Sequence, residues 1–117
     1  MARFGTNLKL TVASANRPRV RALFTGVLSA SVSHTTDELE IYTLEDGGNV
    51  GVYYVAQTEA LRTEDQPKGA WLEFLVADPQ NAAKQLLAAG VPRVDHPDKQ
   101  HDYFQVPGGP VFRLASV

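Results

Sequence analysis

The sequence predicts an α+β fold built from two tandem units, each with the order strand, helix and three strands. Three observations favour this fold class. Residues 7–13 and 71–77 both alternate apolar and polar side chains, as half-buried strands do. An apolar stripe at helical spacing, with a glycine at or near its end, follows each strand. Finally, the two stretches match when the chain is shifted by 64 positions against itself.

The shift places apolar residues on apolar residues and glycine on glycine. The superposed pairs are Leu8 and Leu72, Leu10 and Phe74, Val12 and Val76, Ala13 and Ala77, Leu23 and Leu87, Gly26 and Gly90, and Val27 and Val91. Because one register keeps the strand alternation, the helical stripe and the glycine together, we interpret the match as an internal duplication.

The helix of the second unit has clear signals at both ends. Asp78 is a suitable N-cap, and Pro79 suits the first helical position because its missing N–H is not needed there. Gly90 is expected to end the helix, since glycine enters the left-handed conformation freely. The apolar stripe between them consists of Ala83, Leu86 and Leu87.

The helix of the first unit has weaker signals. Ser14 or Asn16 is the expected N-cap, Pro18 falls in the first turn, and Gly26 is expected near the end. Its apolar stripe consists of Val20, Leu23, Phe24 and Val27.

Three strand-like segments follow each helix. In the first unit they are "SASVSHTT", "ELEIYTL" and "NVGVYYV", with "EDGGN" as a tight turn, and in the second they are "RVDH", "DYFQV" and "PVFRLA". The polar, proline-bearing stretch between the units reads as a linker. We therefore expect one domain over residues 1–117, with the first unit at about 6–55, the linker at about 56–69 and the second unit at about 70–116.

Composition excludes several classes of function. The chain has no cysteine, which excludes disulfides, thiolate metal sites and cysteine nucleophiles. With 11 Lys+Arg against 13 Asp+Glu and no basic stripe, nucleic acid is not an expected partner. No segment has the length of a signal peptide core or of a bilayer span, so we expect a soluble cytoplasmic protein without a membrane partner.

The duplicated order of elements resembles the vicinal oxygen chelate superfamily, which includes glyoxalases, bleomycin resistance proteins and dioxygenases. The segments that carry the resemblance are "LKLTVAS", "LEFLVADPQNAAKQLLAAGV" and "YFQVPGGPVFRLA". The last is similar to the Asp-Pro-x-Gly ending common in the family, with Val106 in place of the aspartate. The resemblance implies curved mixed sheets around a cavity and a homodimer.

The family's metal enzymes hold a divalent ion with one residue from the first strand and one from the last strand of each unit. The positions that match here are Asn7, Tyr53 (or Val52 in a register one residue away), Trp71 and Arg113. Tryptophan has no lone pair to give, arginine stays cationic, and asparagine is a poor lone ligand. The resemblance therefore implies a protein without this metal centre, and we predict no metal and no cofactor.

The polar faces of the two first strands supply the candidate binding residues. Lys9 and Glu73 are equivalent under the shift and have opposite charge, so they either pair with each other or anchor a ligand. The aromatic residues suit either a ligand wall or the core, and Arg113 suits either an anionic ligand or a salt bridge. The full candidate set is Asn7, Lys9, Tyr53, Trp71, Glu73, Tyr103 and Arg113.

These residues together predict a metal-free protein that binds a flat or anionic small organic molecule. One alternative is a metal-dependent lyase, isomerase or dioxygenase with displaced ligands from His34, Glu38, Glu40 or His101. Another is a structural subunit in which Trp71 packs a closed cavity. His96 and His101 fit no recurrent zinc spacing, and His34 is a general base only if a substrate lies beside it.

Overall fold

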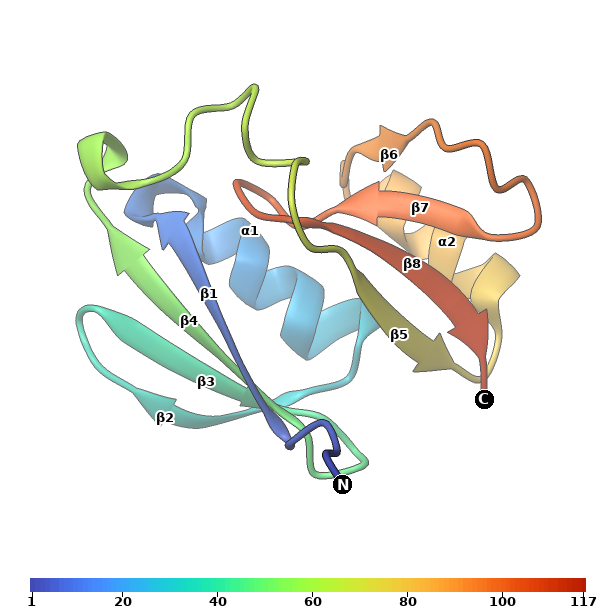
Figure 1. Cartoon of the computed structure of the whole chain (residues 1–117), viewed down its shortest axis with the longest axis horizontal. Helices are drawn as coiled ribbons and strands as arrows, with labels where there is room; N and C mark the ends of the chain where they lie inside the picture. The colour runs from blue at the N-terminus through green and yellow to red at the C-terminus, as the bar shows by residue number, and fades with distance from the viewer.

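The computed structural model describes all 117 residues and contains two four-stranded sheets (Figure 1). The strands of the first unit are β1 (Asn7–Ala13), β2 (Ser31–Thr35), β3 (Leu39–Thr43) and β4 (Asn49–Val55), and its helical segment comprises η1 (Ser14–Asn16), α1 (Arg17–Ala22) and η2 (Leu23–Val27). The second unit comprises β5 (Leu72–Val76), α2 (Pro79–Ala88), β6 (Arg93–Val94), β7 (Asp102–Gln105) and β8 (Val111–Ser116), and η3 (Gln57–Glu59) lies between the units. The predicted order of strand, helix and three strands is confirmed in both units.

The two sheets have the same topology. The first has the order β1-β4-β3-β2 and the second β5-β8-β7-β6. In each, the first strand of the unit runs parallel to the last and the other neighbours are antiparallel. The strands β1 and β5 therefore each keep one edge that pairs with no strand.

The helix ends follow the predictions in the second unit and only in part in the first. The Asp78 carboxylate accepts a hydrogen bond from the Asn81 N–H at 3.1 Å, and Gly90 takes a φ of 77° after the helix. In the first unit no side chain caps α1. Gly26 lies one residue before the end of η2, near the end of the helix as predicted, but Ser29 takes the left-handed conformation after it, with a φ of 54°.

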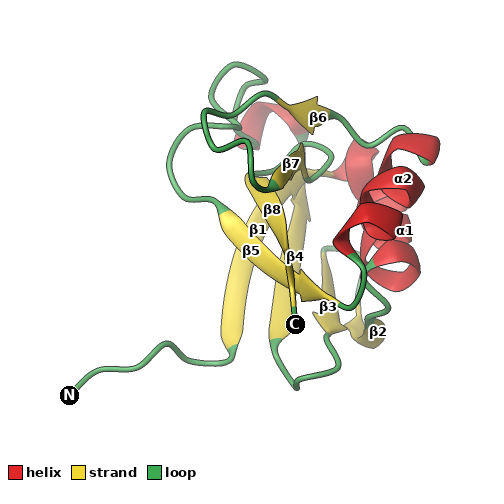
Figure 2. Ribbon diagram, turned by 90° about the vertical axis from the view of Figure 1, so that its right-hand side faces the viewer, coloured by secondary structure: helices red, strands yellow, loops and turns green.

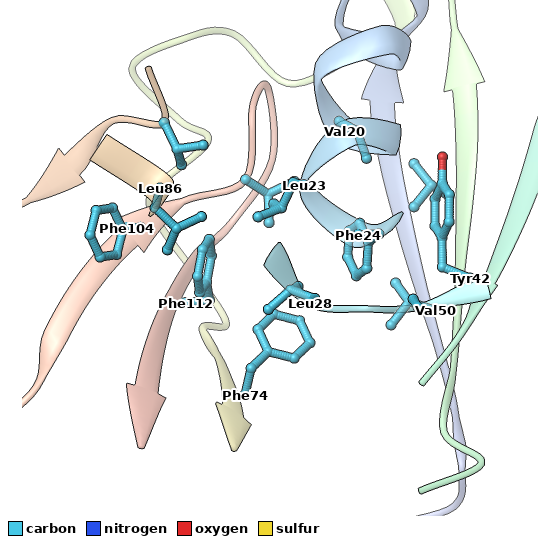
Figure 3. Packing of buried hydrophobic residues seen from close by; sticks show 14 of the residues in the cluster. Val20, Leu23, Phe24, Leu28, Tyr42, Val50, Phe74, Leu86, Phe104 and Phe112 are labelled. Carbon is cyan, nitrogen blue, oxygen red and sulfur yellow. The ribbon is translucent and has the colours of Figure 1, made fainter. Parts of the chain in front are cut away.

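The helices of both units share one hydrophobic core. Figure 2 shows α1 and α2 on the same side of the strands. Phe24 of η2 stacks on Tyr42 of the first sheet, with ring centres 4.8 Å apart, and meets Phe74 of the second sheet edge-on at 5.9 Å (Figure 3). A single cluster of 19 buried residues includes side chains of both sheets and both helical segments.

Each sheet consequently has a helix-covered face and an open face. In β4, Val50, Val52 and Tyr54 are buried toward the helices, while Tyr53 points the other way and is 41% exposed. Trp71, just before β5, is 48% exposed. None of the helices has the length and apolar character needed to cross a membrane.

Candidate ligand-binding faces

The seven predicted binding residues are divided between the open faces of the two sheets. Asn7, Lys9 and Tyr53 belong to the first sheet. Glu73, Tyr103 and Arg113 belong to the second, and Trp71 directly precedes its strand β5. No strand pairing joins these sheets, so one chain holds two separate groups of candidate residues.

On the first sheet, the open face forms a shallow hollow with polar and apolar lining residues. The Asn49 amide donates to Asn7 Oδ1 at 3.0 Å, and the Lys9 ammonium lies 4.9 Å from the centre of the Tyr53 ring. These residues line a hollow of about 260 Å³. Val52, the alternative to Tyr53 in the family register, is fully buried in the core. Tyr53 is therefore the residue of β4 that shares a face with Asn7.

On the second sheet, three polar side chains form a row across neighbouring strands. Tyr103 pairs with Arg113 in the strand register, and Arg113 pairs with Glu73. Arg113 Nε donates to the Glu73 carboxylate at 2.6 Å, and its Nη1 donates to the Tyr103 hydroxyl at 3.4 Å. Hydrogen bonds with Tyr103 and Glu73 raise the pKa of Arg113 above its usual range.

Trp71 lies beside this row. The Arg113 guanidinium carbon is 4.9 Å from the centre of the indole, and the Tyr103 ring meets the indole edge-on with centres 6.3 Å apart. We call Trp71, Tyr103 and Arg113 the aromatic platform. Trp71 is half exposed and Tyr103 is buried, so the indole alone presents the flat apolar surface of the platform to solvent.

The segment 95–101 folds over Tyr103 and adds a residue that sequence reasoning missed. Asp98 accepts a hydrogen bond from the Tyr103 hydroxyl at 2.9 Å and lies 2.6 Å from His101 Nδ1. The N–H of Gln100, the contact with His101 and the Tyr103 hydroxyl lower the pKa of Asp98 to about 2. The His96 ring stacks on Tyr103 with centres 3.9 Å apart. Only the three-residue spacing of Asp98 and His101 hinted at this arrangement.

The predicted ion pair between Lys9 and Glu73 is wrong. These residues lie in different sheets because β1 pairs with β4 and β5 pairs with β8. Glu73 pairs instead with Arg113, and Lys9 forms a cation–π contact with Tyr53 and no ion pair. Of the two readings of Arg113, the structure contains the salt bridge.

The displaced metal ligands of the alternative hypothesis do not come together. Glu40 is fully buried on the helix-covered face, where it accepts hydrogen bonds from Tyr42 at 2.7 Å and Thr35 at 3.0 Å. His101 directly precedes β7 of the other sheet and contacts Asp98. No group of three or more His, Asp or Glu side chains is placed to hold a metal ion. The donor set therefore does not fit the metal centre of this fold.

A groove of about 540 Å³ opens beside the free edge of β1. Leu8 and Leu10 of β1, Leu61 of the linker and Leu72 of β5 supply apolar walls, and Lys9 also contributes to the lining. The groove shows that the unpaired edges of the two sheets border a hollow of ligand size.

Two tandem strand-helix-strand-strand-strand units, each with a mixed sheet and an open face, define the glyoxalase/bleomycin resistance fold. No protein-family model and no curated protein sequence matches the chain. Solved structures confirm the fold.

Three of these structures illustrate the likeness. The fosfomycin resistance protein FosX from Mesorhizobium loti has a TM-score of 0.73 at 16% identity, covering 100% of this chain and 94% of that chain. A possible glyoxalase from Bacillus cereus has a TM-score of 0.71 at 18% identity, covering 97% and 98%. The E126Q mutant of FosX from Listeria monocytogenes, complexed with Mn(II) and 1S,2S-dihydroxypropylphosphonic acid, has a TM-score of 0.72 at 13% identity, covering 99% and 93%. These structures share the fold that the sequence predicted.

Proposed function

We propose that the protein binds a small organic molecule with a flat ring and an anionic group, without a metal ion, in a cavity completed by a second copy of the chain. The observation that carries the proposal is the half-exposed indole of Trp71 on the open face. Burial of apolar surface is worth about 25 cal/mol per Å², so a tryptophan left in water marks a surface that gains from being covered.

The charges on the two open faces indicate which part of the ligand each sheet would bind. The charge of Arg113 is neutralised by Glu73, and its guanidinium also lies 3.6 Å from Asp98. Arg113 therefore holds Trp71 and Tyr103 in place and has no free charge for an anionic ligand. Lys9 forms no ion pair and is the available cation. We therefore assign the flat ring to the aromatic platform and the anionic group to Lys9.

A second copy of the chain would bring the aromatic platform and Lys9 to the same cavity. The helix-covered faces of both sheets are buried in one shared core, and the open faces lie outside this core. Exposed apolar residues accompany the free edges of β1 and β5, namely Leu8, Trp71 and Leu75. A symmetric dimer that places the first sheet of each copy opposite the second sheet of the other would form two equivalent cavities.

The metal-free part of the proposal is supported by the donor set. The four positions that the resemblance matches to the metal ligands are Asn7, Tyr53, Trp71 and Arg113, and this set lacks histidine and carboxylate. The FosX neighbour that binds Mn(II) also binds a phosphonate. The present chain would keep the capacity for an anionic organic ligand and hold it with the Lys9 ammonium instead of a metal ion.

Mixing of variants tests the shared cavity. Lys9→Gln and Trp71→Ala should each weaken binding of phenylphosphonate, measured by isothermal titration calorimetry. In a mixed dimer of the two variants, one cavity carries both changes and the other carries none, so mixing should restore tight sites. Failure to restore them, with dimers demonstrated by sedimentation, would contradict a cavity shared between copies.

Dialysis against Mn²⁺ and Zn²⁺ tests the metal-free claim. We expect no stoichiometric metal to remain bound. One bound ion per chain that is lost in His101→Gln or His34→Gln would overturn this part of the proposal.

A further inference from the structure

We propose that Asp98 and His101 form a proton-transfer dyad beside the aromatic platform, in which His101 Nε2 is a general base toward a flat organic molecule with an acidic C–H or O–H group. The inference rests on the proposed function, because the molecule must bind against Trp71, and it adds a reaction to binding.

The contact between the two side chains fixes the form of the imidazole. His101 Nδ1 lies 2.6 Å from Asp98 Oδ2. A carboxylate accepts hydrogen bonds, and the pKa of Asp98 at about 2 keeps it ionised at neutral pH. Nδ1 of His101 therefore carries the hydrogen, and the lone pair of the neutral ring lies on Nε2.

Asp98 is held in place independently of His101. The Tyr103 hydroxyl donates to Asp98 Oδ2 at 2.9 Å, and the N–H of Gln100 donates to Oδ1 at 2.9 Å. Arg113 Nη1 lies 3.6 Å from Oδ2. These contacts make Asp98 a positioning residue, since a carboxylate fixed on three sides can orient the imidazole.

A chain of side-chain contacts links the dyad to the surface assigned to the ligand. Tyr103 contacts Asp98 through its hydroxyl and Trp71 through its ring, so contacts run without a break from His101 to the aromatic platform. The His101 side chain is 30% exposed, which leaves room for a ligand to reach it. If the contact between Asp98 and His101 only held the segment 95–101 on the sheet, His101 would not act as a base. Kinetics can distinguish this structural role from the proposed one.

The probe for the reaction is 5-nitrobenzisoxazole, a flat aromatic compound with one acidic C–H group. His101 Nε2 would accept the proton from carbon 3 of the probe. The electron pair of that C–H bond forms the nitrile, the N–O bond breaks, and its electron pair moves to the oxygen. The product is 2-cyano-4-nitrophenolate, and the imidazolium returns its proton to water.

Kinetics with matched variants test the proposal. We expect turnover faster than with free imidazole at equal concentration, and a loss of about 100-fold or more in kcat in His101→Gln, the usual weight of a general base. Asp98→Asn should lower kcat more than it changes KM. The control is His34→Gln, on the exposed strand β2 of the other sheet, which should leave the rate unchanged. Equal rates in the unchanged protein and His101→Gln would overturn the proposal.

Two measurements on the unchanged protein complete the test. The ¹⁵N spectrum of His101 should show the hydrogen on Nδ1, and a hydrogen on Nε2 would overturn the proposal even without kinetics. The indole N–H signal of Trp71 reports binding of the probe separately. If the probe binds and no turnover depends on His101, the dyad fails while the proposed function stands. If the probe does not bind at the indole, the dyad proposal fails, while the titration with phenylphosphonate decides the proposed function separately.

Discussion

The guanidinium carbon of Arg113 lies 4.9 Å from the centre of the Trp71 ring, while its Nε donates to Glu73 at 2.6 Å. One side chain thus orients the indole and neutralises the neighbouring carboxylate. Arg113 consequently shapes the open face of the second sheet without adding net positive charge to it.

Replacing Arg113 by lysine should loosen the aromatic platform. Lysine keeps the charge but cannot stack a planar group on the indole while it binds Glu73. We expect the Kd for an aromatic ligand to rise roughly two- to fivefold, which corresponds to the free energy of one exposed cation–π contact. The control is Arg93→Lys, because Arg93 lies over Phe104 at 5.7 Å on the helix-covered face. Equal effects of the two changes on affinity would contradict the assignment.

Glu40→Gln should destabilise the first sheet. The Glu40 carboxylate is fully buried, accepts hydrogen bonds from Tyr42 and Thr35, and lies 3.6 Å from both Arg17 and Arg21. The amide would lose the charged hydrogen bonds, at a cost of about 1–3 kcal/mol in the free energy of unfolding. Urea denaturation measures this cost.

The matched control for this change is Glu38→Gln, an exposed residue next to the same strand. It should change the free energy of unfolding by less than about 0.5 kcal/mol. A similar loss in both variants would show that the buried network has no special role.

The stability that Glu40 provides should depend on pH. Burial opposes ionisation of Glu40, but hydrogen bonds from Tyr42 and Thr35 and the charges of Arg21 and Arg17 outweigh it and lower its pKa from the usual 4.5. The unfolded chain therefore binds this proton at a higher pH than the folded chain. The contribution of Glu40 is complete above the usual pKa and is lost as the pH falls below it.

Urea midpoints at neutral and acidic pH check this sign. The unchanged protein should lose more stability on acidification than Glu40→Gln, because the other carboxylates titrate in both. Parallel pH profiles would contradict the lowered pKa.

Gly108→Ala should cost more stability than Gly47→Ala. Both glycines have positive φ, 74° and 88°, so both changes carry the left-handed cost of about 1–2 kcal/mol. Only at Gly108 would the added Cβ collide with the Asn16 amide and lie 3.1 Å from a Val12 methyl group. Thermal denaturation should rank Gly108→Ala clearly below Gly47→Ala, and the reverse order would contradict the packing of this turn.

Phe24→Ala should weaken both units together. Its ring lies between Tyr42 of the first sheet and Phe74 of the second, and loss of such a ring costs about 3–5 kcal/mol. Trp71 fluorescence follows the second unit, and amide signals of β3 follow the first. We expect one coincident unfolding transition, which tests whether residues 1–117 form a single domain. Two separated transitions would contradict it.

Local signals accounted for the order of elements. Asp78 and Gly90 act on their own backbone within a few residues, so their roles can be predicted from the sequence. Gly26 lies near the end of the first helix, as predicted, but the left-handed residue is Ser29, because the chain continues through a π-helical turn that depends on packing around η2 and that no local pattern encodes.

The contacts of the candidate site were harder to predict. Alternation placed Lys9 and Glu73 on open faces, but their partners depend on which strands are neighbours, and that is a property of the whole sheet. Asp98 reaches Tyr103 only because the segment 95–101 folds back over the sheet. Partner choice of this kind is decided by tertiary structure.

The central claim is that the face around Trp71 binds a flat organic anion, and titration of the indole N–H signal with phenylphosphonate tests it most directly. The chain has one tryptophan, so this signal comes from Trp71 alone. We predict a saturable shift with one ligand per chain, weakened in Lys9→Gln. An indole signal that stays unchanged while phenylphosphonate is added to excess would contradict the account.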